Sequence, residues 1–371
     1  MIINNWYVAA YADDVADTPV PVRMLGTDLV LFRNGAGEVA CLSNVCCHRG
    51  GSLAQGAMCE GCLTCPYHGW HYDASGRVIK IPALGENIRI PKRARVDSYP
   101  VREQNGHIWV FLGDLPEAER PALPDLLPEY GDRETWRTMH FVKDWPINWM
   151  RLSENFADTF HIPFVHAFGK HLSDGISFGR VEENEWGAKT VQSIGARPKK
   201  TQTNAALIET LPEQRKTTEL TIEVSLIGMM QRNHQELAPG VTQLLWNAWV
   251  PVDEDTTRHF GLHLRQFKTE PDYDEDMMKA IQAVLDEDAA ALSSVSPVVA
   301  PATTTNELFT QADSMEAIIR RKIRELGRKL GTIDTHMQRE ERKYRVMVIP
   351  SPARRQEPAN WVHQTMPLIQ S

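Results

Sequence analysis

The chain has 371 residues, with 40 Lys and Arg against 48 Asp and Glu, which gives a formal net charge of −8. At roughly 100–200 residues per domain, this length predicts two domains, or three small ones. The acidic balance disfavours nucleic acid as a partner, because binding to the phosphate backbone needs clustered basic residues. No window approaches the roughly 18 uninterrupted apolar residues of a membrane-spanning helix, and the N-terminus lacks a basic segment followed by an apolar one. We therefore expect a cytoplasmic protein with no membrane association.

Short β-like segments separated by turn residues fill the N-terminal part of the chain. Strands are predicted over 29–34, 38–44, 77–84 and 106–114. Residues 116–130 then contain four prolines, which disfavour a regular helix or a central strand and predict a linker. We therefore expect one domain over 1–115 and a second over 131–371.

Five of the six cysteines fall within twenty residues of the first domain. Cys46-x-His48 and Cys65-x-x-His68 each offer one thiolate and one imidazole. Two such pairs can hold two irons, with both cysteines on one iron and both histidines on the other. The surrounding motifs, CCHRG and CPYHGW, resemble the cluster loops of Rieske proteins, in particular of Rieske oxygenases. The resemblance implies a Rieske [2Fe-2S] cluster bound by these four residues.

A zinc site is the alternative for the clustered cysteines. Cys59, Cys62 and Cys65 also have thiolate spacing that suits zinc. Structural zinc sites normally combine two separated CxxC pairs, which this segment does not offer, so we favour the iron–sulfur cluster. Cys47 stands where Rieske oxygenases often have proline, and we expect this difference to alter the stiffness of the loop without removing a ligand.

A second group of candidate ligands lies in the segment SENFADTFHIPFVH. Three of its polar residues recur at intervals of three, on one face of a helix predicted over about 148–160: Asn155, Asp158 and His161. His166 would lie about 140° around an ideal helix from His161. The two histidines can therefore share a metal only if the chain bends, and Pro163 between them can supply the bend.

Two histidines and one carboxylate form the facial triad of non-haem Fe(II) oxygenases. The segment matches E/D-N-x-x-D-x-x-H-x-x-x-x-H, and so it resembles the catalytic motif of Rieske non-haem iron oxygenases. The resemblance implies that His161 and His166 bind a mononuclear iron, with a carboxylate from a helix about 120 residues further on. The segment LDEDAAAL lies there, and we choose Asp288, with Asp286 and Glu287 as the other candidates.

Asp158 precedes His161 by about one helical turn, where its carboxylate can fix the tautomer of the imidazole. The resemblance further implies a head-to-tail homotrimer in which Asp158 links His68 of the partner subunit to an iron-binding histidine. Electrons would then pass between subunits by a short path. A purely structural carboxylate is the alternative. Asn155 is assigned a place beside the iron, as a weak ligand or a hydrogen-bond partner.

The remaining elements are predicted from hydrophobic spacing. A hairpin is expected from 243–252 and 258–267, followed by a helix over about 273–293. A further helix near the C-terminus is indicated by apolar residues at helical spacing: Ile318, Ile319, Ile323, Leu326 and Leu330. We favour the protein core over a partner for its apolar face, because most amphipathic helices face the core.

We interpret the chain as the oxygenase component of a Rieske non-haem iron oxygenase with an α+β fold. The resemblance implies an all-β Rieske domain followed by a catalytic domain with a curved antiparallel sheet and helices, of the helix-grip, START-like type. It also implies a separate flavin or iron–sulfur reductase, with or without a ferredoxin, that passes NAD(P)H electrons to the cluster. The mononuclear Fe(II) would then use O₂ to oxidise a small organic substrate, typically an aromatic one.

Monooxygenation, including O- or N-demethylation, is the favoured reaction, because the chain is short and resembles the homotrimeric members. A ring cis-dihydroxylating dioxygenase is the alternative within the family. A Rieske electron-transfer protein without the mononuclear iron is an alternative of another class, and a zinc-dependent hydrolase or scaffold is a third. The length argues against a simple carrier, since a Rieske carrier needs only about a hundred residues.

Overall fold

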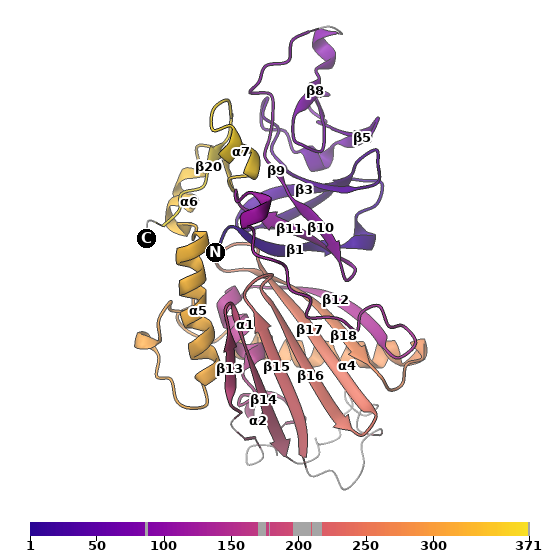
Figure 1. The fold of residues 1–371 in the computed structure, drawn as a ribbon, viewed down its shortest axis with the longest axis vertical. Coiled ribbons are helices and arrows are strands. Elements are labelled where there is room, and N and C mark those ends of the chain that lie inside the picture. Colours follow the sequence, from indigo (N-terminus) through magenta and orange to yellow (C-terminus); the bar gives the residue numbers. More distant parts are fainter. Residues whose placement is uncertain (86–87, 170–175, 178, 196–208, 210–216, 370–371) are drawn as a thin grey trace. The chain divides into compact units, whose positions relative to one another are not determined.

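The computed structural model describes residues 1–85, 88–169, 176–177, 179–195, 209 and 217–369. The chain forms two compact units (Figure 1). Unit 1 comprises Met1–Leu123, Val252–Glu254 and Leu326–Ser371, and unit 2 comprises Pro124–Pro251 and Asp255–Glu325. The first boundary falls inside the predicted proline-rich linker. Within the described ranges, no helix is long and apolar enough to cross a lipid bilayer.

Unit 1 consists mainly of short antiparallel strands. One sheet has the order β1 (Asn5–Tyr11), β11 (His107–Leu112) and β10 (Val101–Gln104). A second has the order β2 (Val20–Met24), β3 (Thr27–Arg33), β4 (Val39–Ser43) and β9 (Ser98–Tyr99). A third has the order β5 (Ala57–Cys59), β6 (Cys62–Thr64), β7 (His71–Tyr72) and β8 (Val78–Lys80). The all-β N-terminal domain expected from the sequence is confirmed.

Three of the four predicted N-terminal strands are confirmed as β3, β4 and β11. Strand β11 lies between β1 and β10 and is buried at every position, which explains its nearly continuous apolar sequence. The predicted strand over 77–84 is shorter than expected, because β8 ends at Lys80. Pro82 then begins a 3₁₀ turn at Pro82–Leu84, since proline cannot donate to a strand ladder.

The last part of the chain, Leu326–Ser371, belongs to unit 1, whereas the sequence placed it in the second domain. The physical reason is the pairing of buried polar groups. The hydroxyl of Tyr99 donates to the carbonyl oxygen of Ile349 at 2.7 Å. The fully buried carboxylate of Asp97 accepts hydrogen bonds from Arg354 at 2.6 and 2.8 Å. Buried polar groups need such partners, so the C-terminal segment completes unit 1. This segment contains α6 (Thr335–Glu341), β19 (Met347–Val348), α7 (Pro352–Gln356) and β20 (Gln364–Thr365).

Unit 2 contains a seven-stranded antiparallel sheet with helices packed against it (Figure 1). The strand order is β12 (Arg137–Trp145), β18 (Thr257–Arg265), β17 (Val241–Pro251), β16 (Met230–Ala238), β15 (Thr217–Ser225), β14 (Gly187–Gly195) and β13 (Val181–Asn184). The helices are α1 (Trp149–Ala157), α2 (Ile162–Val165), α4 (Asp274–Leu292) and α5 (Ser314–Leu330). The last residues of α5, from Leu326 on, belong to unit 1. The predicted hairpin and the two predicted later helices are confirmed as β17–β18, α4 and α5.

Apolar side chains attach the helices of unit 2 to its sheet. Trp145 of β12 and Trp249 of β17 are almost fully buried and pack with Leu152 of α1 and Leu285 of α4. Burying one such side chain contributes roughly 1.5–3 kcal/mol. The two helices that carry candidate ligands are therefore held in place by the core.

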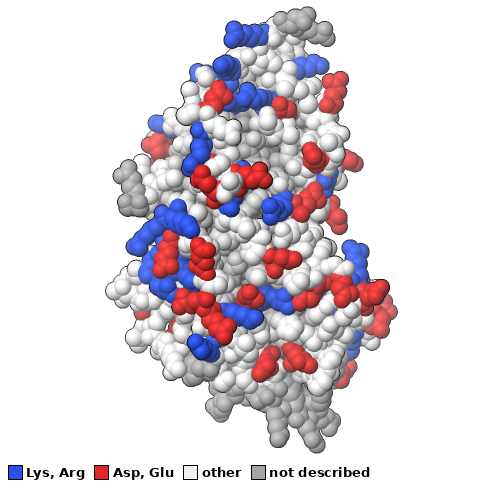
Figure 2. Space-filling view, in the orientation of Figure 1, with Lys and Arg blue, Asp and Glu red and all other residues white. Residues whose placement is uncertain are grey.

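Charged side chains of both signs are interspersed over the face drawn in Figure 2. Exposed ion pairs occur in both units, such as Arg258 with Asp144 at 2.7 Å. Exposed pairs of this kind contribute about 0–1 kcal/mol each, so they add little to the stability of the fold.

Candidate functional site

The four predicted cluster ligands lie in two loops of unit 1 that share a backbone pattern. In the first loop, the Gly50 N–H donates to the carbonyl oxygen of Cys46 at 3.0 Å. In the second loop, the Gly69 N–H donates to the carbonyl oxygen of Cys65 at 2.9 Å. Both glycines have a positive φ, of 74° and 69°, which glycine adopts without strain. The two loops therefore present their cysteines in a similar way.

These loops place thiols inside the unit and imidazoles near its surface. The side chains of Cys46 and Cys65 are only 3% and 1% exposed. His48 is exposed, and the centroids of the His48 and His68 rings lie 4.4 Å apart. The His48 ring also stacks on Trp70, with centroids 4.4 Å apart. Two buried thiols and two accessible imidazoles form a donor set that fits a Rieske [2Fe-2S] cluster.

The other cysteines of this segment have different surroundings. Cys59 and Cys62 lie opposite each other in the β5–β6 hairpin. In the described part of the chain, they do not form a close group of three metal-ligand residues with Cys65. The hydroxyl of Tyr72 lies 2.9 Å from Sγ of Cys46 and 3.3 Å from Sγ of Cys47, a contact that the sequence did not indicate.

Helix α1 ends at Ala157, earlier than the sequence predicts. Asp158 is extended, and its carboxylate accepts hydrogen bonds from the backbone N–H groups of Phe160 at 2.7 Å and His161 at 3.2 Å. His161 is then the N-cap of the short helix α2, which has Pro163 in its first turn. The expectations that His161 continues the face of α1 and that the chain bends at Pro163 are wrong. The bend lies at residues 158–160, because the Asp158 side chain satisfies the free N–H groups there.

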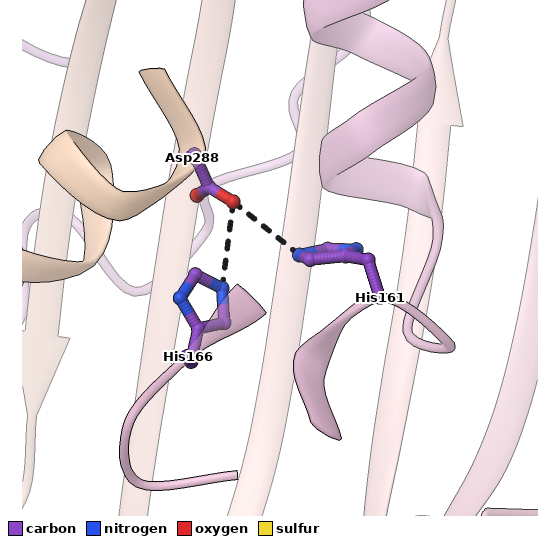
Figure 3. A group of neighbouring side chains, drawn as sticks. All are labelled: His161, His166 and Asp288. Carbon is purple, nitrogen blue, oxygen red and sulfur yellow. Dashed lines mark ion pairs between the residues drawn. The ribbon is translucent and has the colours of Figure 1, made fainter. Parts of the chain in front are cut away.

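His161, His166 and Asp288 come together from the segment after α1 and from α4 (Figure 3). Oδ1 of Asp288 lies 3.4 Å from Nε2 of His161 and 3.4 Å from Nε2 of His166. The ligand atoms of all three residues lie within 4.8 Å of one another. Oδ1 of Asp288 is buried and accepts no well-formed hydrogen bond from the described residues. A buried carboxylate oxygen that faces two imidazole nitrogens fits a mononuclear Fe(II) centre.

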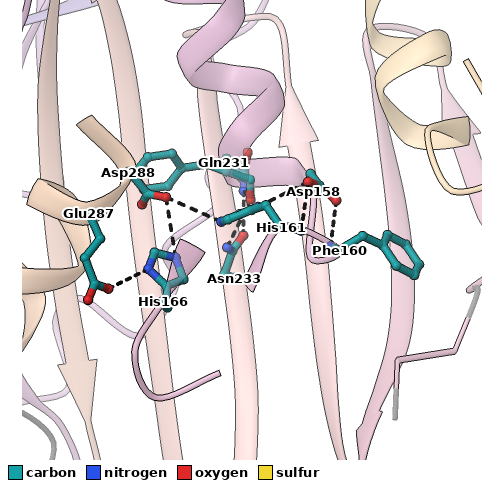
Figure 4. A network of polar contacts seen from close by, with 9 residues as sticks. Asp158, Phe160, His161, His166, Gln231, Asn233, Glu287 and Asp288 are labelled. Atoms are coloured by element: carbon teal, nitrogen blue, oxygen red, sulfur yellow. Dashed lines mark hydrogen bonds and ion pairs between the residues drawn. The ribbon is translucent and has the colours of Figure 1, made fainter. Parts of the chain in front are cut away.

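Each imidazole also has a carboxylate beside its Nδ1 atom, on the side away from Asp288 (Figure 4). Oδ2 of Asp158 lies 3.1 Å from Nδ1 of His161, and Oε2 of Glu287 lies 2.9 Å from Nδ1 of His166. When Nδ1–H donates to a carboxylate, Nε2 keeps its lone pair for a metal. Both imidazoles are therefore oriented with Nε2 toward Asp288.

The three candidate carboxylates of α4 point to different partners. Asp288 faces both Nε2 atoms, whereas Glu287 holds Nδ1 of His166. Asp286 is exposed and pairs with Lys143 at 2.6 Å. Of the three, Asp288 has the position of the predicted iron ligand.

The carboxylates around His161 favour a positive charge. Burial lowers the pKa of this imidazole, but the hydrogen bond to Asp158 and the negative charges of Asp158 and Asp288 outweigh burial and raise it to about 9. A cation is therefore well matched to the group, and a metal that binds Nε2 has to displace a proton.

Two amides of β16 that the sequence did not single out lie beside this group (Figure 4). Gln231 and Asn233 bond to each other at 2.8 Å, and both donate to the carbonyl oxygen of Phe156 in the last turn of α1. They tie the end of α1 to the sheet. No local motif marks them, because the register of the sheet brings them there. Asn155, by contrast, has a buried Nδ2 that donates to no described residue, and its role stays a prediction.

Two protein families match this chain. Residues 5–100 match the Rieske [2Fe-2S] domain, and residues 145–329 match the vanillate O-demethylase oxygenase C-terminal domain. The first range contains the four predicted cluster ligands. The second range contains the triad of histidines and aspartate.

Curated proteins with similar sequences include oxygenase subunits. The tert-butanol monooxygenase / tert-amyl alcohol desaturase oxygenase subunit of Aquincola tertiaricarbonis is 28% identical over 285 residues, 72% of this chain and 57% of the relative. The oxygenase component of dicamba O-demethylase from Stenotrophomonas maltophilia is 35% identical over 167 residues, 44% of this chain and 47% of the relative. The chain thus spans about half the length of these curated relatives.

Solved structures with the same fold match most of this chain. Dicamba monooxygenase bound to dicamba has a TM-score of 0.73 at 22% identity, over 88% of this chain and 97% of that one. NdmA of Pseudomonas putida CBB5 with caffeine has a TM-score of 0.72 at 22% identity, over 86% of this chain and 89% of that one. They confirm the α+β fold. With a Rieske domain and an oxygenase C-terminal domain in one chain, this protein belongs to the Rieske oxygenase family.

Proposed function

We propose that this chain is the terminal oxygenase component of an O₂-dependent system that oxidises a small organic substrate with electrons from NAD(P)H. The observation that carries the proposal is the buried Oδ1 of Asp288, 3.4 Å from Nε2 of both His161 and His166. This donor set suits Fe(II) and leaves coordination positions open. The same donor set disfavours the alternative of a Rieske electron carrier without the mononuclear iron.

The ligand residues have distinct tasks in this proposal. When bound by His161, His166 and Asp288, Fe(II) supplies O₂ activation. Asp158 and Glu287 hold the two imidazoles in the tautomer that points Nε2 inward. The apolar packing of α1 and α4 on the sheet keeps the positions of these ligands constant and excludes water from that side.

Electrons are proposed to enter through a cluster held by Cys46, His48, Cys65 and His68. Asp158 is a suitable link to the iron, because its side chain is 31% exposed while Oδ2 contacts Nδ1 of His161. In a head-to-tail homotrimer, this exposed carboxylate would accept a hydrogen bond from His68 of the partner subunit. A separate flavin or iron–sulfur reductase, with or without a ferredoxin, would supply the electrons, as the words "oxygenase component" in the name of one relative suggest.

Monooxygenation, including O- or N-demethylation, is the reaction we propose, with an aromatic compound as the first substrate class to test. The match to the vanillate O-demethylase oxygenase C-terminal domain supports demethylation over ring cis-dihydroxylation. The names of similar proteins, dicamba O-demethylase and tert-butanol monooxygenase, also support this reaction type. We propose a cytoplasmic location. Cys59 and Cys62 lie opposite each other in a hairpin but form no disulfide, as is typical of proteins in the reducing cytosol.

Iron analysis and oxygen uptake test the proposal together. The oxygenase should contain about three irons per chain, whereas a carrier should contain about two. With a generic reductase, O₂ uptake should rise with one class among aromatic acids, aryl ethers, N-methyl compounds and polycyclic compounds. Formaldehyde release would identify demethylation, and two ¹⁸O atoms from one O₂ in a diol would identify dihydroxylation. About two irons and no uptake with any class would refute the oxygenase assignment.

A further inference from the structure

Cys47 is a buried thiol beside a proposed cluster ligand, and neither the cluster nor the iron site uses it. Its Sγ lies 3.3 Å from the hydroxyl of Tyr72, and the same hydroxyl lies 2.9 Å from Sγ of Cys46. All three side chains are buried, with Tyr72 fully excluded from solvent. The three polar atoms therefore form a short row that ends at a cluster ligand.

The hydrogens in this row can be assigned by counting donors. As a cluster ligand, Cys46 is a thiolate and can only accept a hydrogen bond. A phenol has one hydrogen to donate, and Tyr72 directs it best to Cys46, which is both closer and charged. The oxygen of Tyr72 then still has lone pairs, and the S–H of Cys47 is the donor beside them.

The surroundings of Cys47 support this direction. The Cys47 side chain is only 6% exposed and packs in the hydrophobic core of unit 1, so water competes little for its S–H. Among the described residues, the Tyr72 hydroxyl is the hydrogen-bond partner found for the Cys47 sulfur.

We propose that Cys47 is a positioning residue that raises the reduction potential of the Rieske cluster by donating its S–H to the hydroxyl of Tyr72. This proposal rests on the proposed ligand role of Cys46. A hydrogen bond to a ligand sulfur withdraws electron density and so stabilises the reduced, more negative cluster. A donor to the Tyr72 oxygen polarises its O–H and strengthens the bond to Cys46. Proline, which the related loops often have at this position, carries no such donor.

The test is the midpoint potential of the cluster in the holo-protein, measured by voltammetry and by titration followed by electron paramagnetic resonance. Cys47→Ala should lower the potential, and Tyr72→Phe should lower it further. Cys47→Ser, whose hydroxyl can still donate, should stay close to the wild type. In the Tyr72→Phe background, Cys47→Ala should cause no additional change, because the thiol acts through the tyrosine. Cys59→Ala, which removes an exposed thiol of the same segment, is the matched control and should leave the potential unchanged.

An unchanged or raised potential in Cys47→Ala overturns the proposal, since a rise would mean that Tyr72 divides its hydrogen between two sulfurs. An equal decrease with and without the Tyr72 hydroxyl also overturns it, because the thiol would then act by another route. If Cys47→Ala does not retain the cluster, Cys47→Val against Cys47→Ser gives the same comparison. A wild-type protein without a Rieske spectrum refutes the ligand assignment as well, whereas a normal spectrum with no shift refutes only the role of Cys47.

Discussion

Oε2 of Glu287 lies 2.9 Å from Nδ1 of His166, while the next residue, Asp288, faces Nε2 of the same imidazole at 3.4 Å. Consecutive residues of an α-helix point about 100° apart. One turn of α4 can therefore hold one imidazole from two sides. Glu287, which the sequence offered only as an alternative iron ligand, thus has the geometry of a residue that orients His166.

Glu287→Gln should weaken iron binding roughly 10–100-fold, because a neutral amide orients His166 less firmly and makes it a weaker ligand. The measurement is the iron retained after dialysis against a graded series of chelator concentrations, with the cluster spectrum as a check on unit 1. Asp286→Asn is the matched control, since Asp286 is exposed and pairs with Lys143. Equal loss of iron in both variants would show that iron binding depends on the total negative charge of α4 and not on the contact between Glu287 and His166.

Asp158→Asn should leave both metal sites loaded but reduce reductase-dependent turnover roughly 10–100-fold. The single asparagine oxygen can still accept the shorter of the two backbone hydrogen bonds, from Phe160, so the bend after α1 should persist. The carboxylate charge that links His161 to the surface is lost. The rate of cluster reoxidation after mixing with O₂ and substrate measures this step. Asp144→Asn, another partly exposed acid of unit 2, should react at the wild-type rate, and a wild-type rate in Asp158→Asn would contradict the bridge.

Glu316 gives unit 2 a pH-dependent stability. Its side chain lies in the first turn of α5, the residue is 7% exposed, and its Oε2 has no hydrogen-bond partner among the described residues. Burial, assisted by the charges of Asp158 and Glu154, raises the pKa of Glu316 to about 8. In the unfolded chain, this carboxyl ionises near pH ~4.3. Between these values the unfolded state binds fewer protons, so stability falls as the pH rises from about 4.3 to about 8.

Glu316→Gln should remove this penalty. At pH 8 the variant should be more stable than the wild type by roughly 2–4 kcal/mol, and the difference should vanish near pH 4. Thermal unfolding of both proteins at pH 4, 6 and 8 measures the trend. Glu325→Gln, on an exposed position of the same helix, should show no such dependence. A constant difference at all three pH values would mean that Glu316 does not titrate in this range.

Arg320→Ala should destabilise unit 2 by roughly 3–5 kcal/mol. The Arg320 side chain is only 2% exposed, donates to Glu154 at 2.7 Å and pairs with Glu307 at 2.6 Å. Its removal leaves the buried carboxylate of Glu154 without its paired cation, whereas Glu307 keeps Arg151 at 2.6 Å. Denaturant unfolding measures the loss. Arg321→Ala is the control, since this arginine is 41% exposed and its loss should cost less than about 1 kcal/mol. Similar losses in both variants would count against a special role of the buried pair.

The donor sets of both proposed metal sites were predictable from the sequence. The motifs Cys46-x-His48 and Cys65-x-x-His68 and the spacing of His161 and His166 are local patterns. Such patterns can be recognised without knowing how the rest of the chain folds. The helices α4 and α5 and the β17–β18 hairpin were equally predictable, because hydrophobic periodicity reports which face of an element is buried.

Which of these groups meet depends on how the chain folds. The choice of Asp288 among three consecutive acids depends on how α4 is rotated, and the packing of Leu285 on Trp249 sets that rotation. The early end of α1, the amides of Gln231 and Asn233, and the contact of Cys47 with Tyr72 are equally invisible in the sequence. Each depends on contacts between chain segments that meet only after folding, and residue spacing carries no information about such contacts.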